Sequence, residues 1–180
     1  MVELKKRDST KDELLNSLDK FVTENLTTDQ QEKMLSISSL VFSQTSVAFT
    51  LYKNGSIASE LKEFEFKILM IMIMIAMYDH FSGDLDIDEE VKWTILTLGI
   101  ADGYLDFPNC FDYYIEEAIR ARDIVNKIIK LEQDWVRDIF AEAIEISKKI
   151  SDKGSPFPIL KFFEKQELVL TVKEFFKEIL

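Results

Sequence analysis

The hydropathy pattern is dominated by an unbroken apolar run in the middle of the chain. Ten consecutive apolar residues, Ile68 to Met77, lie within the sequence KILMIMIMIAMYDH, in a chain of which 31% of the residues are charged. A membrane-spanning helix needs about 20 apolar residues, and charged residues flank this run on both sides. A strand rarely exceeds about eight residues, and methionine favours helices. The run therefore predicts a buried helix over residues 57–81, surrounded by other helices.

Capping patterns predict further helices on both sides of this central one. The sequences TKDE at 10–13 and TDQQ at 28–31 are typical of capping boxes, and Asn54-Gly55 is typical of a helix end. Residues 109–153 contain neither Gly nor Pro and show helical spacing, with a break expected near 130–134. Residues 159–180 are predicted to be helical, with a short strand at 168–172 as the alternative. The expected fold is an all-α, single-domain bundle of six to eight helices around the central helix at 57–81.

The sequence SGDLDIDEE at 82–90 predicts an acidic turn between two helices. Gly83 is expected to end the central helix, and DIDE at 86–89 resembles a capping box that begins the next helix, predicted over 87–102. The pattern GDLDI at 83–87 returns as GYLDF at 103–107. We expect one kind of helix-to-helix turn to be used twice.

A short resemblance accompanies the second of these turns. The sequence IADGYLDF at 100–107 resembles the turn motif of tellurite-resistance TerB-like helical domains, in which Ala-Asp-Gly is followed by an acidic residue about one turn later. Asn109 or Cys110 stands where that family places a glutamate, and the resemblance covers fewer than ten residues. It therefore assigns no family.

The sequence contains none of the common catalytic or cofactor-binding motifs. A Gly-rich phosphate loop, HExxH and GxSxG are all lacking, and Glu89 and Ile95 stand where a calcium loop from Asp84 needs Gly and a bidentate Glu. The only histidine, His80, is interpreted as a residue that interacts with the dipole of a helix end. We predict no enzyme activity and no cofactor. A looser carboxylate metal site at 79–90, in an enzyme or a sensor, remains the alternative.

The acidic residues are concentrated in one part of the chain. The formal net charge is −11, and residues 79–117 hold eleven acidic side chains against one basic residue, Lys92. Concentrated negative charge disfavours nucleic acid and anionic membranes and favours a basic protein partner. Aromatic side chains in the same stretch would supply the desolvated contacts of an interface. The predicted partner-binding residues are Asp84, Asp86, Asp88, Glu89, Glu90, Trp93, Tyr104, Asp106, Asp112, Tyr113 and Glu116.

This interaction chemistry resembles that of immunity proteins, which neutralise cationic nuclease toxins. The resemblance predicts an inhibitor of a basic partner, such as a nuclease-type toxin. The N-terminal sequence lacks the apolar stretch of a signal peptide, and the single cysteine excludes an internal disulfide, so we expect a cytoplasmic protein. Two other interpretations remain: a solvated acidic face with no partner, and a scaffold that assembles through the Phe-rich C-terminal segment.

Overall fold

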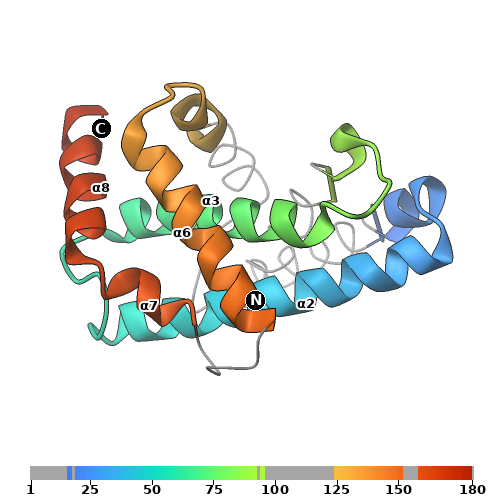
Figure 1. The fold of residues 1–180 in the computed structure, drawn as a ribbon, viewed down its shortest axis with the longest axis horizontal. Coiled ribbons are helices and arrows are strands. Elements are labelled where there is room, and N and C mark those ends of the chain that lie inside the picture. The colour runs from blue at the N-terminus through green and yellow to red at the C-terminus, as the bar shows by residue number, and fades with distance from the viewer. Residues whose placement is uncertain (1–15, 18, 93, 96–123, 152–157, 180) are drawn as a thin grey trace, which may run out of the picture.

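The computed structural model describes residues 16–17, 19–92, 94–95, 124–151 and 158–179. These residues form helices and contain no strand, which confirms the all-α prediction (Figure 1). The principal helices are α2 (Thr28–Lys53), α3 (Glu63–Ser82), α6 (Asp134–Ser151), α7 (Leu160–Phe163) and α8 (Gln166–Ile179). Shorter helical stretches lie at 19–25, 89–92 and 124–129. The predicted capping box at 10–13 and the second turn at 103–107 lie outside the described residues.

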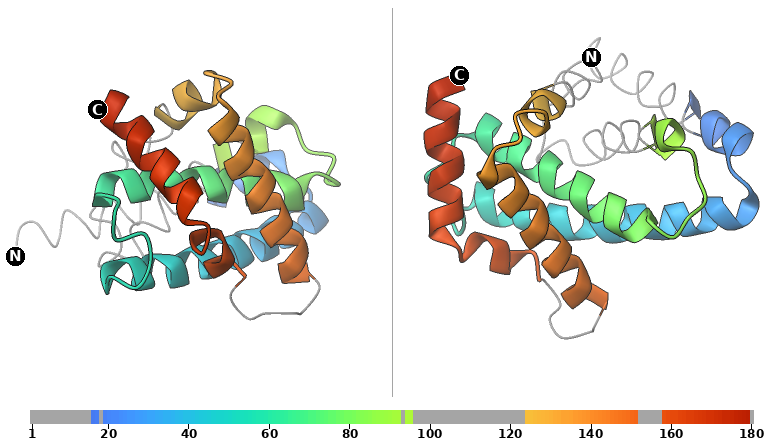
Figure 2. Two further views of the ribbon diagram at one scale, coloured as in Figure 1. Left: turned by 60° about the vertical axis from the view of Figure 1, so that its left-hand side comes forward. Right: turned by 45° about the horizontal axis from the view of Figure 1, so that its top comes forward.

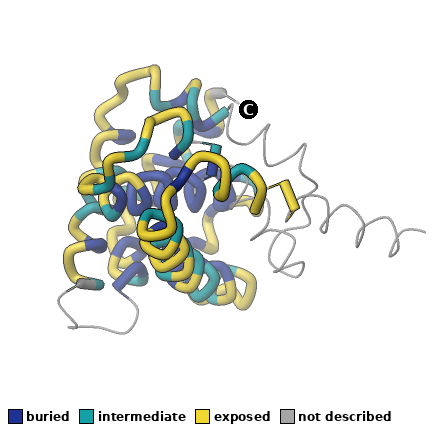
Figure 3. Tube along the Cα trace, turned by 90° about the vertical axis from the view of Figure 1, so that its right-hand side faces the viewer, coloured by how far each residue is buried: buried dark blue, intermediate teal, exposed yellow. Residues whose placement is uncertain are grey.

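Helix α3 is the buried centre of the bundle, as the apolar run predicts. Every residue from Phe66 to Tyr78 is buried. Helices α2 and α6 pack on α3, and α8 lies near its N-terminal end (Figure 2). Figure 3 shows the buried residues gathered along this axis, with exposed residues on the outer helices. An apolar surface on all sides of a helix is stable only when neighbours cover every side.

The start of α3 differs from the sequence prediction. The helix begins at Glu63 and not at residue 57, because residues 57–62 form a loop in which Ala58 has a φ of 48°. Lys62 is extended, and its backbone N–H donates to Glu65 Oε2 at 2.7 Å. A positive φ ends helical geometry, so the polar residues before Glu63 do not extend the helix.

Helix α2 is one unbroken helix of 26 residues despite its many Ser and Thr residues. Its capping box is formed by Thr27 and Gln30, one position earlier than the predicted one. Hydroxyl groups within the helix, such as that of Thr45, donate back to carbonyls of the preceding turn. The helix ends at Asn54, and Gly55 follows with a φ of 77°, as the Asn-Gly pair predicts.

By length and composition α2 is also the one helix, among the described residues, that is apolar enough to cross a membrane. About 33% of its most apolar window is buried within the structure. Core helices of soluble proteins and signal sequences meet the same criterion, so the criterion assigns no membrane to α2.

The C-terminal half forms a second layer over α3. The short helix at 124–129 ends in a turn at residues 130–133, where Glu132 has a φ of 50°, and α6 follows. This confirms the break predicted near 130–134. Residues 168–172 are part of α8, so the strand alternative is wrong. The Phe-rich segment packs inward: Phe162, Phe163 and Phe176 are buried. These three side chains thus belong to the core of this chain, and Phe175 is half-buried beside them.

Candidate functional site

The predicted acidic turn, residues 82–90, lies within the described part of the chain. It follows the C-terminal end of α3, where Gly83 ends the helix as predicted, with a right-handed φ of −60°. Leu85 and Ile87 are half-buried against the core, while Asp84, Asp86 and Asp88 are exposed. The two apolar residues therefore hold the turn to the bundle, and the three aspartates beside them remain exposed.

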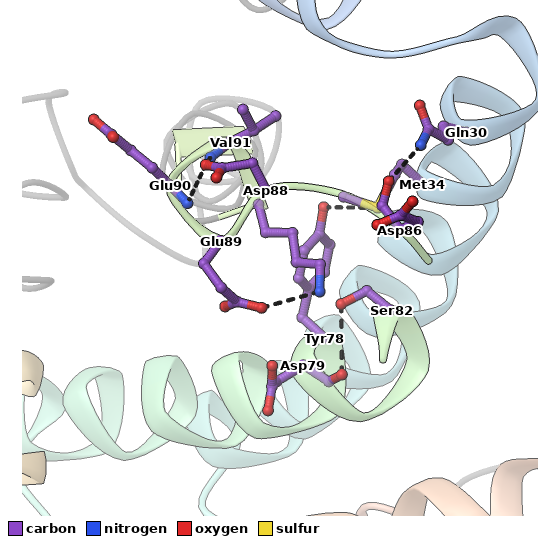
Figure 4. A network of polar contacts seen from close by, with 11 residues as sticks. Gln30, Met34, Tyr78, Asp79, Ser82, Asp86, Asp88, Glu89, Glu90 and Val91 are labelled. Carbon is purple, nitrogen blue, oxygen red and sulfur yellow. Dashed lines mark hydrogen bonds and ion pairs between the residues drawn. The ribbon is translucent and has the colours of Figure 1, made fainter. Parts of the chain in front are cut away.

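One hydrogen bond joins the turn to helix α2, and a second contact joins the end of α3 to the same helix (Figure 4). Gln30 Nε2 donates to the backbone carbonyl oxygen of Asp86 at 2.7 Å. Below the turn, the Tyr78 hydroxyl donates to Met34 Sδ at 3.6 Å. Burial of this phenol raises the pKa of Tyr78 to about 12. The turn is therefore attached to α2 through Asp86, and the end of α3 that precedes the turn is attached to α2 through Tyr78.

The helix after the turn begins at a different cap from the predicted one. Asp88 Oδ1 accepts hydrogen bonds from the backbone N–H groups of Glu90, at 2.9 Å, and Val91, at 3.3 Å. The sequence pattern placed the cap at Asp86, which is wrong by two residues. Ile87 packs against the core, and the helix begins only after Asp88.

The carboxylates of the turn differ in the partners they have. Lys92 Nζ lies 3.1 Å from Glu89 Oε1, and the Lys92 side chain is only 11% exposed. Asp88 is engaged as a cap. The exposed carboxylates of Asp84, Asp86 and Glu90 form no hydrogen bond or ion pair with another described residue. These three carboxylates are exposed and unpartnered among the described residues, whereas the exposed Glu89 carboxylate is already paired with Lys92.

The remaining chemistry near the turn is sparse. His80 is exposed in the last turn of α3, with its ring 5.4 Å from that of Phe81, in the position expected for a residue at a negative helix end. Within the described ranges, no group of three or more His, Cys, Asp and Glu side chains converges so that it could hold a metal ion. The metal-site alternative thus has no described cluster to support it.

Five described residues of the predicted interface, namely Asp84, Asp86, Asp88, Glu89 and Glu90, come together in the acidic turn. The other six predicted residues lie outside the described residues: Trp93, Tyr104, Asp106, Asp112, Tyr113 and Glu116. The aromatic part of the predicted surface therefore remains a prediction from sequence.

Sequence reasoning missed a second acidic surface. Asp138, Glu142 and Glu145 share one face of α6 because they are four and three residues apart. These three residues line a groove between α6 and the α7–α8 segment, and Glu164 and Glu167 line it from the other side. Residues 119–180 carry nearly equal numbers of acidic and basic side chains, so the regional charge balance concealed this cluster. Helical spacing of the acidic residues was the pattern that would have revealed it.

The chain matches no protein family, no curated protein and no solved structure. The functional argument therefore depends on the geometry and charge of the described residues.

Proposed function

We propose that this chain is a cytoplasmic binding protein that recognises a basic protein partner through its acidic turn, residues 84–90. We further propose that it acts as immunity proteins do, by neutralising a partner such as a nuclease-type toxin. The observation that supports the proposal is the set of exposed carboxylates, Asp84, Asp86 and Glu90, that lack any described cationic partner.

Electrostatics favours a basic partner over other ligands. Like charges held close together repel one another, so a fixed acidic turn costs stability that an incoming cationic surface recovers. The same field steers a basic protein toward the turn and raises its association rate. DNA, RNA and anionic membranes carry the same sign of charge and are repelled.

Rigidity of the turn also supports binding. The hydrogen bond from Gln30 to Asp86 and the cap at Asp88 restrain the backbone of the turn. A recognition surface that is ordered before binding loses less conformational entropy when the complex forms. The charges of the turn therefore meet a partner in a defined arrangement.

The test is capture of the partner from a lysate of the native host, followed by binding of the purified pair. The turn variant reverses the three unpartnered charges and leaves the Asp88 cap and the Glu89–Lys92 pair intact: Asp84→Lys, Asp86→Lys and Glu90→Lys. The matched control makes the same change of net charge at exposed positions outside the acidic turn: Asp19→Lys, Glu32→Lys and Glu178→Lys.

We expect the wild-type chain and the control to capture one basic protein at about 50 mM salt and to lose it largely at about 500 mM. The turn variant should bind the purified protein at least about 100-fold more weakly. If that protein is a nuclease toxin, the wild-type chain should inhibit its activity in proportion to binding. Equal binding by the turn variant and the control would refute the acidic turn as the recognition site.

A further inference from the structure

A pocket lies at the end of α3 that is opposite to the acidic turn. It is formed between the loop at 56–60, which precedes α3, and residues between 160 and 170 of the α7–α8 segment (Figure 1). The acidic turn follows the other end of α3, which is 20 residues and about 30 Å long. The pocket has a volume of about 370 Å³, within the range of about 300–1,000 Å³ that is typical of sites for small molecules.

The buried part of the pocket lining is apolar and continuous with the core. Ala58, Phe163 and Val169 line the pocket and are buried, and the Phe163 ring stacks on the Phe66 ring of α3 at 5.7 Å. Leu170 also lines the pocket, but its side chain remains 46% exposed. A ligand that covered Leu170 would gain affinity, because apolar surface would leave water.

The loop wall of the pocket is held in an unusual backbone conformation. Ala58 has a φ of 48°, a region that residues with a Cβ seldom adopt. Hydrogen bonds hold both sides of it: the Ser56 N–H donates to the Leu51 carbonyl at 2.8 Å, and the Tyr52 hydroxyl donates to the Leu61 carbonyl at 2.9 Å. Strain of this kind persists only where the surrounding structure enforces it, and it is common at ligand sites. The wall is thus formed before a ligand binds, which lowers the entropy cost of binding.

Two carboxylates of the pocket have no described partner. Glu60 lines it from the loop, and Glu164 lines it from the junction of α7 and α8. Both residues are exposed, and neither side chain forms a hydrogen bond or ion pair with another described residue. Among the described residues that line the pocket, none is a lysine, arginine or histidine. The lining therefore combines negative charge from two sides with an apolar surface.

We propose that this pocket binds a small organic amine that carries an apolar group. The ammonium group pairs with the carboxylates of Glu60 and Glu164, and the hydroxyl of Ser59 accepts a further hydrogen from it. The apolar group lies against Phe163 and Leu170. An anion would be repelled by the two carboxylates, and a hydrophilic amine would leave the apolar lining in contact with water. The proposal does not depend on the function of the acidic turn.

The test titrates the full chain with phenethylamine and follows the backbone amides by two-dimensional NMR. Phenethyl alcohol and phenylacetate carry the same ring with a neutral or a negative group. We expect phenethylamine to bind at least about tenfold more tightly than phenethyl alcohol, and phenylacetate not to bind. Shift changes should be centred on residues 56–60 and 160–170. Changes centred on the acidic turn, or equal affinity for the amine and the alcohol, would overturn the proposal.

The charges of the pocket are tested by Glu60→Gln combined with Glu164→Gln, which keeps the size of both side chains. The matched control, Asp138→Asn combined with Glu167→Gln, removes two exposed carboxylates from the neighbouring groove between α6 and the α7–α8 segment. The pocket variant should bind phenethylamine at least about tenfold more weakly, and the control should bind it as the wild type does. Circular dichroism checks that both variants are folded. Equal loss in the two variants would refute the pocket, because it would show attraction by total charge.

The apolar part of the lining is tested separately. Leu170→Ala shortens an exposed side chain of the pocket, and Leu131→Ala is the matched control, because Leu131 is 50% exposed and lies outside the lining. Leu170→Ala should weaken phenethylamine binding about three- to tenfold, and Leu131→Ala should leave it unchanged. An unchanged affinity in Leu170→Ala, or absence of saturable binding by the wild-type chain, would contradict the assignment.

Discussion

The position of the helix cap in the acidic turn leads to a sharp prediction about stability. Asp86 and Asp88 are both exposed aspartates two residues apart, and the sequence pattern favoured Asp86 as the cap. In the structure Asp88 Oδ1 accepts two backbone N–H groups, at 2.9 and 3.3 Å, and the Asp86 side chain accepts none that is described. Substitution by Ala should therefore affect the two positions differently.

The expected magnitudes follow from what each side chain does. Loss of an aspartate cap costs about 1 kcal/mol, within a range of about 0.5–2. An exposed side chain without partners changes the free energy of unfolding by about 0.5 kcal/mol at most. In a chain of this size, Asp88→Ala should lower the Tm by about 2–4 °C, and Asp86→Ala should leave it nearly unchanged.

Thermal unfolding followed by circular dichroism measures both variants. Asp88→Ser is the matched control, because a serine hydroxyl can cap the helix but carries no charge. Its Tm should lie close to that of the wild type, which makes it the variant of choice for testing the charge of Asp88 in partner binding. The reasoning fails if Asp86→Ala is the more destabilised of the two, or if Asp88→Ser is as unstable as Asp88→Ala.

Three further predictions concern the bundle. Gly55→Ala should lower the free energy of unfolding by about 1 kcal/mol, because φ at this position is 77°; an added Cβ meets no atom within 4 Å, so the cost is backbone strain alone. Gly83→Ala, at φ −60°, should be neutral or slightly stabilising. Urea unfolding compares the two variants. A hydrogen bond from Lys67 lowers the pKa of Glu63 from 4.5. The ionised Glu63 therefore stabilises the folded state above pH 4.5, and this stabilisation is lost as the pH falls through the lower folded-state pKa. Glu63→Gln should flatten the fall in urea midpoint below pH 4.5. Phe66→Ala should cost about 3–5 kcal/mol in urea unfolding, because the ring is fully buried, and a loss below 1 kcal/mol would contradict its place in the core.

The sequence was sufficient to predict the centre of the fold. An apolar run without periodicity can be stable only inside a bundle, and Phe66 to Tyr78 are indeed buried. The start of that helix was not predictable in the same way. Residues 57–62 have helix-compatible composition, but the loop depends on a left-handed Ala58, a residue type that gives no warning of such a conformation.

Local caps were predicted to within one or two positions for a related reason. Thr27 and Thr28 are adjacent, and the two glutamines that could be the reciprocal partner, Gln30 and Gln31, are adjacent as well. Asp86 and Asp88 present the same ambiguity. At Asp86 and Asp88 a tertiary contact bears on the choice, since the half-buried Ile87 between them packs against the core. A sequence pattern shows that a cap is present more reliably than it shows which residue forms it.

The acidic turn was predicted from local charge density, whereas the groove was not. Carboxylates close together in sequence are close in space, so the residues from Asp84 to Glu90 needed no fold to be recognised. The groove brings Asp138 beside Glu167 only because α6 and α8 pack antiparallel. Basic residues of the same segment balance the cluster in any regional sum.

A net charge of −11 attracts every cation, so binding of a basic protein does not by itself identify a site. Attraction of this long-range kind decays over about 8 Å at physiological salt and depends little on which carboxylate is removed. Recognition at short range depends on where the charges stand and on what stands beside them. Triple variants of equal net charge separate the two effects, because they alter the position of the charge and not its total. A loss confined to the turn variant supports the proposed function, whereas an equal loss in the turn variant and the control would show attraction without a site.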